Sequence, residues 1–240
     1  MKIFLAGAGG VIGRRLTPLL RAAGHTVTGT TRSAAKADAI AKLGAEPAVV
    51  DVFDAAALAH AVMAARPDAI IHQLTDLAFA PGTPRYQEGL ARNARLRIEG
   101  TRNLVAAARA AKVTRMVAQS IAFFVYAPGP GMRVESDPLN SDPAVASTME
   151  GVIALEKEVL SLREGVVLRY GFFHGPGTWS PDTPRKPALH IDAAAQAALL
   201  ALTKGEPRIY NIAEDDPGLS SEKAKRDLGF DASFRISPSS

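Results

Sequence analysis

The 240-residue sequence has no cysteine, which excludes disulfide bonds, zinc–thiolate sites and thiol nucleophiles. No apolar run is long enough to cross a bilayer, and the apolar stretch after Lys2 is too short for a secretory signal. Aromatic residues make up only 6%, and the basic residues behind the net charge of +4 are dispersed. The five histidines are scattered, without the spacing of a metal site. We therefore expect a cytoplasmic protein that binds no nucleic acid, membrane or metal.

Apolar residues make up 47% of the chain, enough for a large core, and short apolar runs alternate with Ala-rich helical segments. Strands that are buried on both faces of a parallel sheet are continuously apolar. The alternation therefore predicts an α/β fold, a Rossmann-type doubly wound parallel sheet of about seven strands with a small C-terminal substrate lobe. The expected strands are 2–6, 26–30, 47–50, 69–73, 115–120, 166–169 and 209–212. The expected helices are 11–23, 34–43, 55–65, 86–111, 145–162 and 193–203.

The longest expected helix, 86–111, has an apolar stripe at helical spacing, with arginines on its other faces. The stripe consists of Leu90, Ala94, Ile98, Thr101, Val105 and Ala108. Residues 1–178 are interpreted as the NAD(P)-binding Rossmann domain, and residues 179–240 as reduced substrate-lobe segments that complete the same domain. The loops 127–143 and 175–187 are rich in proline and glycine, and we expect them to border the ligand crevice.

A glycine-rich turn follows the first expected strand directly and leads into an apolar helix. One glycine permits the tight turn, one lets the backbone approach a diphosphate, and one lets helix and strand pack closely. The free N–H groups at the positive end of the helix then hold the diphosphate. This context predicts dinucleotide binding. The expected contacts lie at Gly7, Gly9, Gly10, Val11, Ile12 and Gly13.

The end of the second strand indicates which dinucleotide is bound. An acidic residue there would accept hydrogen bonds from a ribose 2′-hydroxyl and favour NAD(H), but the segment Thr31-Arg32-Ser33 has none. Arg32 can pair with a 2′-phosphate, with help from the hydroxyl of Thr31 or Ser33. We therefore expect NADP(H), with NAD(H) as the alternative if Arg32 is only a surface residue.

Two further strand ends are candidate cofactor contacts. Asp51 can accept a hydrogen bond from the adenine amino group, with Val52 against the ring. A role for Asp51 as the N-cap or turn acid of the next helix is the alternative, and Asp54 competes for that role. The segment Gln73-Leu74-Thr75 ends the fourth strand beside the expected ribose.

These features together resemble the extended and atypical short-chain dehydrogenase/reductase superfamily, the NAD(P)-dependent epimerase/dehydratase-like proteins. The resemblance implies a cofactor at the topological switch point, cofactor contacts at Gly171, Phe172 and Phe173, and a homodimer packed through long helices. The residues that support this resemblance extend from residue 1 to about 178, and further segments that match the family lie beyond. They are Gly7, Gly10 and Gly13, and then the segments 51–52, 70–72, 99–104, 117–120, 167–169, 175–178, 190–194 and 210–212.

The catalytic pattern of the superfamily is incomplete in this chain. Ser120 stands where the family serine is expected, but none of the four tyrosines has a lysine four residues later. In the family this tyrosine exchanges a proton with the substrate, and the lysine lowers its pKa and holds the cofactor ribose. Arg97 also stands where relatives often have asparagine. Tyr126 is a candidate replacement proton donor and His174 a second one, although each is alternatively structural.

We therefore expect an NADP(H)-dependent oxidoreductase of the atypical short-chain class that acts on a small carbonyl or alcohol substrate. A nucleotide-sugar epimerase or dehydratase and a non-catalytic NADP(H)-binding sensor are the alternatives. Two segments of the family's substrate lobe are missing, so either the lobe is small or loops are absent from this sequence. The substrate itself does not follow from the fold.

Overall fold

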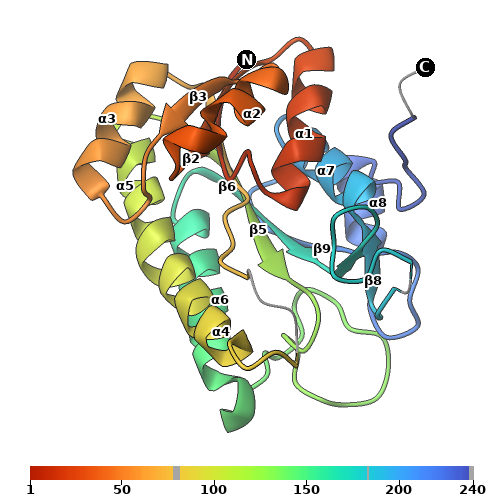
Figure 1. The fold of residues 1–240 in the computed structure, drawn as a ribbon. Coiled ribbons are helices and arrows are strands. Elements are labelled where there is room, and N and C mark those ends of the chain that lie inside the picture. The colour runs from red at the N-terminus through yellow and green to blue at the C-terminus, as the bar shows by residue number, and fades with distance from the viewer. Residues whose placement is uncertain (78–81, 183, 238–240) are drawn as a thin grey trace.

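The fold is a seven-stranded sheet in the order β3-β2-β1-β4-β5-β6-β9, seen in a computed structural model that describes residues 1–77, 82–182 and 184–237 (Figure 1). Every neighbouring pair in the sheet is parallel. The strands are β1 (Lys2–Ala6), β2 (Thr26–Thr31), β3 (Glu46–Val49), β4 (Ala69–His72), β5 (Arg115–Ile121), β6 (Glu164–Tyr170) and β9 (Ile209–Ile212).

Helices cover both faces of the sheet, as Figure 1 shows. One layer contains α1 (Val11–Ala22), α2 (Ala37–Lys42), α7 (Ile191–Leu200) and α8 (Glu222–Leu228). The other contains α3 (Ala55–Ala65), α4 (Tyr86–Arg95), α5 (Thr101–Ala110) and α6 (Ala146–Leu160). In the described part of the chain, no helix is both long and apolar enough to cross a lipid bilayer.

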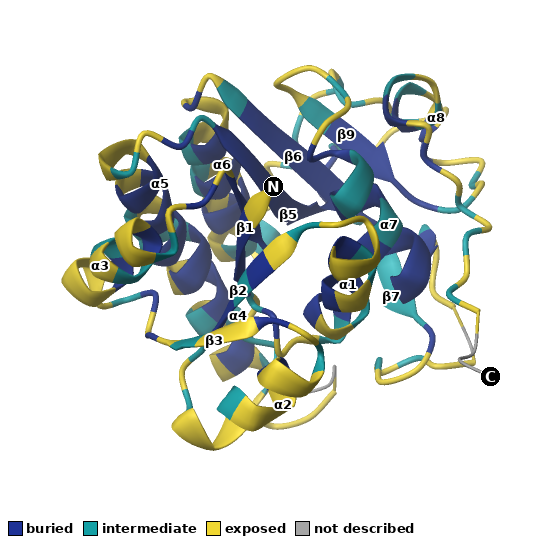
Figure 2. Ribbon diagram, turned by 90° about the horizontal axis from the view of Figure 1, so that it is seen from above, coloured by how far each residue is buried: buried dark blue, intermediate teal, exposed yellow. Residues whose placement is uncertain are grey.

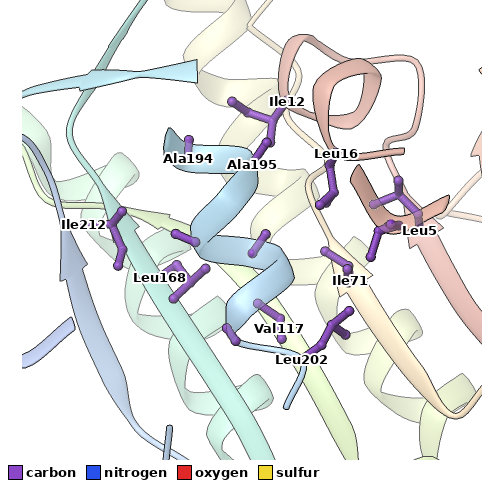
Figure 3. Close-up of a cluster of buried hydrophobic side chains, with 14 of the residues drawn as sticks. Leu5, Ile12, Leu16, Ile71, Val117, Leu168, Ala194, Ala195, Leu202 and Ile212 are labelled. Atoms are coloured by element: carbon purple, nitrogen blue, oxygen red, sulfur yellow. The ribbon is translucent and has the colours of Figure 1, made fainter. Parts of the chain in front are cut away.

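Each face of the sheet has its own apolar core, and the central strands are buried between them (Figure 2). The first core lies under α1 and α7, where Leu16 of α1 meets Leu5 and Ile71 of the sheet (Figure 3). Helix α7 fits closely because its buried face is almost entirely alanine. Burial on both faces explains why the central strands are continuously apolar in sequence.

The expected fold class and all seven strands are confirmed, with bounds that differ by at most two residues. One additional pair of strands was not expected: β7 (Phe172–His174) and β8 (Ala188–His190) form a separate two-stranded parallel ribbon. These three-residue segments are too short for a periodicity signal. The seventh strand of the main sheet, β9, comes from the segment after residue 178, so this segment completes the sheet.

The longest expected helix is correct in extent, and four of the six residues of its apolar stripe are buried, whereas Leu90 and Ile98 are only half-buried. A π-helical turn, Leu96–Gly100, joins α4 to α5; we call it the π segment. Its wider turn shifts the helix register, so Leu96 and Arg97 are buried and Ile98 is only half-buried. Periodicity of 3.6 residues cannot anticipate such a turn, which is frequent at functional sites.

Candidate active site

The carboxyl ends of the strands meet along one edge of the sheet, and this edge holds every candidate residue. From β1 the chain proceeds outward to β2 and β3 and then crosses to β4 on the other side of β1. The carboxyl ends of β1 and β4 therefore form the topological switch point, where ligands of such sheets bind.

The glycine turn between β1 and α1 has the geometry that its sequence predicts. Gly7 has φ +98°, and a Cβ there would lie 2.8 Å from the Gln73 carbonyl carbon. A Cβ on Gly13 would lie 2.2 Å from the Gly7 carbonyl oxygen, so only glycine lets helix and turn pack this closely. The Thr30 hydroxyl accepts a hydrogen bond from the Gly7 N–H at 3.1 Å and ties the turn to β2.

The start of α1 leaves room and free donors for an anionic ligand. A Cβ on Gly9 would meet nothing within 4 Å, so the backbone there faces open space. Gly10 caps α1 without a side-chain hydrogen bond, and the first turn of the helix has no acidic residue. The N–H groups of this turn are therefore available at the positive end of the helix dipole. This cradle fits the diphosphate of a dinucleotide.

The segment after β2 presents an exposed cation beside two hydroxyl groups. The Thr31 hydroxyl accepts a hydrogen bond from the Ser33 N–H at 3.1 Å, which orders the turn around Arg32. The Arg32 side chain is 59% exposed, and its guanidinium lies 3.9 Å from the Asp76 carboxylate. Arg92 of α4 reaches the same carboxylate at 3.3 Å. Two guanidinium groups thus converge on this end of the crevice. Only Arg32 was expected there, because Arg92 falls outside the apolar stripe of its helix.

At the end of β3, the structure separates the roles of two carboxylates. Asp54 caps α3 by accepting a hydrogen bond from the Ala57 N–H at 2.9 Å. Asp51 is exposed, and its Oδ1 accepts from the Phe53 N–H at 3.0 Å, leaving Oδ2 toward solvent. Asp51 therefore does not cap the helix. Val52 is buried against the π segment, and the predicted contacts of Asp51 and Val52 with adenine stay predictions.

The end of β4 contains buried polar side chains beside the turn. The amide nitrogen of Gln73 lies 3.5 Å from the Tyr170 hydroxyl, whereas its oxygen has no partner among the described residues. His72 accepts from the Leu74 N–H at Nδ1 and bonds the Thr101 hydroxyl through Nε2. Burial lowers the pKa of His72 to about 4, with a further contribution from the charge of Arg97. Leu74 is half-buried and Thr75 exposed at the rim.

The family serine position is part of a buried polar network. Ser120 is 1% exposed and donates a hydrogen bond at 2.7 Å to Glu156 of α6. Arg169 of β6 donates to both oxygens of the same carboxylate, at 2.9 and 2.7 Å. Both partners of this ion pair are nearly inaccessible to solvent. The proton of the Ser120 hydroxyl is therefore already engaged in a hydrogen bond to Glu156.

Tyr126 extends the same network to β9. Its hydroxyl accepts from Arg169 at 3.0 Å and donates to the Asn211 side-chain oxygen at 2.5 Å. Burial is the largest effect on the tyrosine and raises its pKa, while the charge of Arg169 opposes this. The proton and a lone pair of the phenol are both engaged. A catalytic role for Ser120 or Tyr126 stays a prediction. Hereafter "the buried network" means Ser120, Tyr126, Glu156, Arg169 and Asn211.

His174 lies in a second polar group near the C-terminal segment. Its Nε2 is 2.7 Å from a Glu214 oxygen that Arg235 also contacts at 3.3 Å. The ring of His190 lies edge-on to that of His174, and its Nδ1 caps α7 by accepting from the Asp192 N–H. Burial lowers the pKa of His190. The role of His174 as a proton donor stays a prediction.

Two stacked aromatic side chains, Phe123 and Phe172, lie beside the end of β6, and we call them the aromatic wall. Phe172 stacks on Phe123 with ring centroids 3.9 Å apart, and the Arg185 guanidinium lies 4.3 Å from the centroid of the Phe172 ring. Gly171 is required here because a Cβ would lie 2.6 Å from the Pro187 carbonyl oxygen. Phe173 packs near Tyr170 on the core side. The cofactor contacts expected at 171–173 stay predictions.

A cleft of about 270 Å³ opens beside this wall, between the loop after β5 and the segment 216–219. Backbone hydrogen bonds of Arg133 with Gly218 and Ser220 join the two segments. The lining combines aromatic residues with one basic and one acidic residue, Arg133 and Asp216. Its residues are Ala122, Phe123, Phe124, Tyr126, Ala127, Pro128, Gly129, Gly131, Arg133, Pro187, Asp216, Gly218 and Leu219.

Comparisons with known proteins agree with this geometry. The model of the NAD(P)H-binding family matches residues 7–151, more than half of the chain. A relative from a Streptomyces species, 3-diazoavenalumate denitrifying reductase, is 38% identical over 92% of this chain and 79% of its own length.

Solved structures show the same fold at low sequence identity. The UDP-glucose 4-epimerase of Thermotoga maritima, solved with UDP-glucose, superposes with a TM-score of 0.78 at 16% identity, covering 98% of this chain and 94% of its own. The UDP-glucose 4-epimerase of Thermus thermophilus, in complex with NAD, gives a TM-score of 0.75 at 20% identity, with 98% and 95% covered.

The matched family model covers the glycine turn, the Arg32 segment and the π segment, and the relative shares nearly the whole chain. The chain thus belongs to the NAD(P)H-binding family and is an NAD(P)-dependent enzyme of the oxidoreductase type.

Proposed function

We propose that the protein is an NADPH-dependent reductase that delivers hydride to a small aromatic diazo compound, which loses its nitrogen as N₂. The observation that carries this proposal is the 38% identity, over 92% of the chain, with a reductase named for a denitrifying reaction on a diazo substrate. The proposal replaces the small carbonyl or alcohol that the superfamily resemblance alone suggests.

The proposed reaction needs no tyrosine as a proton donor, and this chain lacks the Tyr-Lys pair that provides one in the superfamily. When bound, the cofactor supplies hydride, and the balanced reaction is ArN₂⁺ + NADPH → ArH + N₂ + NADP⁺. The new C–H bond takes the electron pair of the hydride, and the C–N bond breaks with its electrons leaving on N₂. No substrate oxygen becomes an alkoxide, so no tyrosine needs to donate a proton. The missing Tyr-Lys pair and the committed hydroxyls of Ser120 and Tyr126 are consistent with such a reaction.

The cleft beside the aromatic wall is the proposed substrate site. Its volume of about 270 Å³ suits a single small ring better than a nucleotide sugar. Phe123 and Phe124 offer ring faces, and the Arg133 side chain is only 22% exposed. In this proposal the aromatic side chains hold the substrate ring and exclude water, and Arg133 binds an acidic substituent.

The test is a deuterium-transfer assay with diazotised 3-amino-4-hydroxybenzoic acid as the probe. NADPH deuterated at nicotinamide C4 is expected to disappear with release of N₂. Deuterium should appear on the carbon that carried the diazo group, faster than in a protein-free control. No acceleration over that control would overturn the proposal. Parallel arms with ketones and UDP-glucose distinguish a carbonyl reductase and an epimerase, and NADPH binding without turnover in any arm would indicate a sensor.

We also infer a preference for NADPH over NADH, supported by the exposed guanidinium of Arg32 beside the Thr31 and Ser33 hydroxyls. Arg32→Ala should weaken NADPH binding about 10-fold and leave NADH binding unchanged, because only NADPH has the phosphate that the guanidinium pairs with. Lys42→Ala, which removes an exposed charge from the end of α2, is the control. Equal affinities of the native protein for NADPH and NADH in a fluorescence titration would contradict the inference.

A further inference from the structure

Arg97 of the π segment is a buried cation without a partner. The residue is 5% exposed. Within the described ranges, the structure gives its guanidinium no hydrogen bond and no carboxylate within 4 Å. A charge that is withdrawn from water without a partner destabilises the folded protein. Such a group is expected where a ligand completes its interactions.

The local packing holds Arg97 against α6, the helix that carries the Tyr-Lys pair in the superfamily. A Cβ on Gly151 of α6 would lie 3.1 Å from the Ala94 Cα and 3.3 Å from the Arg97 Cβ. Glycine at position 151 therefore allows α4 and α6 to approach closely, with the Arg97 stem in the contact. Arg97 belongs to the π-helical turn that lies at this contact.

The charge of Arg97 acts at the carboxyl ends of β4 and β5. It lowers the pKa of His72, which ends β4, and it interacts with Glu156, which holds Ser120 near the end of β5. Glu156 is already bonded to Arg169 and Ser120, and it lies beyond ion-pair distance of Arg97. Burial lowers the pKa of Arg97 to about 10, so the side chain stays charged at neutral pH.

The nicotinamide half of the cofactor is the ligand that fits this position. With the diphosphate on α1 and the adenosine toward β2 and β3, the nicotinamide ribose would lie over the ends of β4 and β5. We propose that the Arg97 guanidinium binds the hydroxyls of the nicotinamide ribose, and so supplies from the π segment the fixed cation that the absent lysine of α6 would provide. This proposal rests on the cofactor of the family and not on the diazo substrate.

The experiment measures cofactor binding and thermal stability without any substrate. Full-length native protein and Arg97→Met are titrated with NADPH and with 2′,5′-ADP, which lacks the nicotinamide ribose. Arg97→Met should weaken NADPH binding about 10- to 100-fold, because charge-assisted hydrogen bonds to the ribose are lost. Affinity for 2′,5′-ADP should not change. Arg102→Met, which removes an exposed arginine from α5, is the charge-matched control and should leave both affinities unchanged.

Thermal melts separate a ligand-binding arginine from a structural one. Without ligand, Arg97→Met should melt at the same temperature as the native protein or higher, because an unpaired buried charge is gone. Its stabilisation by NADPH should shrink in line with the weaker affinity. Arg97→Lys keeps the charge on a shorter side chain and should retain more NADPH affinity than Arg97→Met.

Three results would overturn the proposal. The first is failure of Arg97→Met to fold, together with an equal loss of affinity for NADPH and for 2′,5′-ADP in Arg97→Lys, which would indicate a structural arginine. The second is unchanged NADPH affinity in a folded Arg97→Met. The third is equal weakening of NADPH and 2′,5′-ADP, which would place the cation at the adenosine half.

Discussion

The polar groups at the two ends of the crevice differ in whether they already have hydrogen-bond partners within the protein. At the adenosine and diphosphate end, the N–H groups of α1 have no capping side chain, Gly9 faces open space, and Arg32 is exposed. At the β5–α6 end, Ser120 and Tyr126 are buried, and their hydroxyls are bonded to neighbouring side chains. The first end has free donors for a ligand, whereas the hydroxyls of Ser120 and Tyr126 at the second end already have partners within the protein.

This difference bears directly on the chemistry. Groups that are left free in the folded protein cost stability unless a ligand meets them, so their presence marks a binding surface. Groups that are bonded to one another contribute to the fold. In the proposed function, a cofactor cradle is therefore combined with a bonded scaffold behind the substrate. The predictions below test that division, beginning with the largest expected effect.

Removing the carboxylate of the buried network should destabilise the protein more than any other single change discussed here. Glu156→Ala leaves the Arg169 guanidinium buried without its partner, which costs about 3–5 kcal/mol of unfolding free energy. Urea denaturation measures this loss. Glu150→Ala, at an exposed position of the same helix, is the control and should change stability little. A loss below about 1 kcal/mol for Glu156→Ala would show that the network does not hold the scaffold.

The two ends of the crevice also differ in how far they could be predicted from the sequence. The glycine turn is a contiguous segment, and the same few residues set its backbone geometry and its function, so a single sequence was sufficient to predict it. The parallel strands were likewise predictable, because burial on both faces makes each strand continuously apolar.

The buried network was not predictable, because its members come from distant parts of the chain. Glu156 and Arg169 lie on α6 and β6, and Asn211 is 85 residues from its partner Tyr126. One signal was available. Glu156 lies among the buried residues of α6, and Arg169 interrupts an otherwise apolar strand, so each required a buried partner of opposite charge. Their pairing, and the π-helical turn that contains Arg97, depend on tertiary packing.

His72 lies at the boundary between the two ends, and both of its ring nitrogens have hydrogen-bond partners within the protein. Its pKa is lowered to about 4 from an ordinary value of 6.5, so the unfolded chain binds the additional proton between these pH values. Stability should therefore fall as the pH falls from about 6.5 to 4, by about 3 kcal/mol from this residue. His72→Asn keeps an acceptor for the Leu74 N–H but cannot titrate, so denaturation curves across this range should fall less steeply. Identical pH dependence in both proteins would show that His72 is not buried in the neutral form.

The glycine turn should tolerate no side chain at its closest contact. Gly13→Ala places a Cβ 2.2 Å from the Gly7 carbonyl oxygen, so the turn must move and lose its fit to the diphosphate. We expect NADPH affinity to fall roughly 100-fold, about 2.8 kcal/mol of binding free energy. Gly24→Ala is the control. Gly24 has a positive φ of +80°, which disfavours alanine, but a Cβ there meets nothing within 4 Å, so this change should weaken the fold without changing NADPH affinity. Unchanged NADPH affinity in Gly13→Ala would remove the turn from the binding site.

Tyr126 tests most directly whether the buried network only stabilises the fold or also takes part in catalysis. Tyr126→Phe removes a hydroxyl that bonds Arg169 and Asn211, which should lower the unfolding free energy by about 1–2 kcal/mol. The rate of NADPH oxidation with the diazo probe should not change, because hydride displacement of N₂ requires no proton from a phenol. Tyr86→Phe, at the start of α4, controls for the loss of a phenol elsewhere. A rate that falls at least about 10-fold, with NADPH affinity retained, would make Tyr126 a proton donor. The β5–α6 end would then be catalytic as well as structural, and a carbonyl substrate would replace the diazo compound as the better proposal.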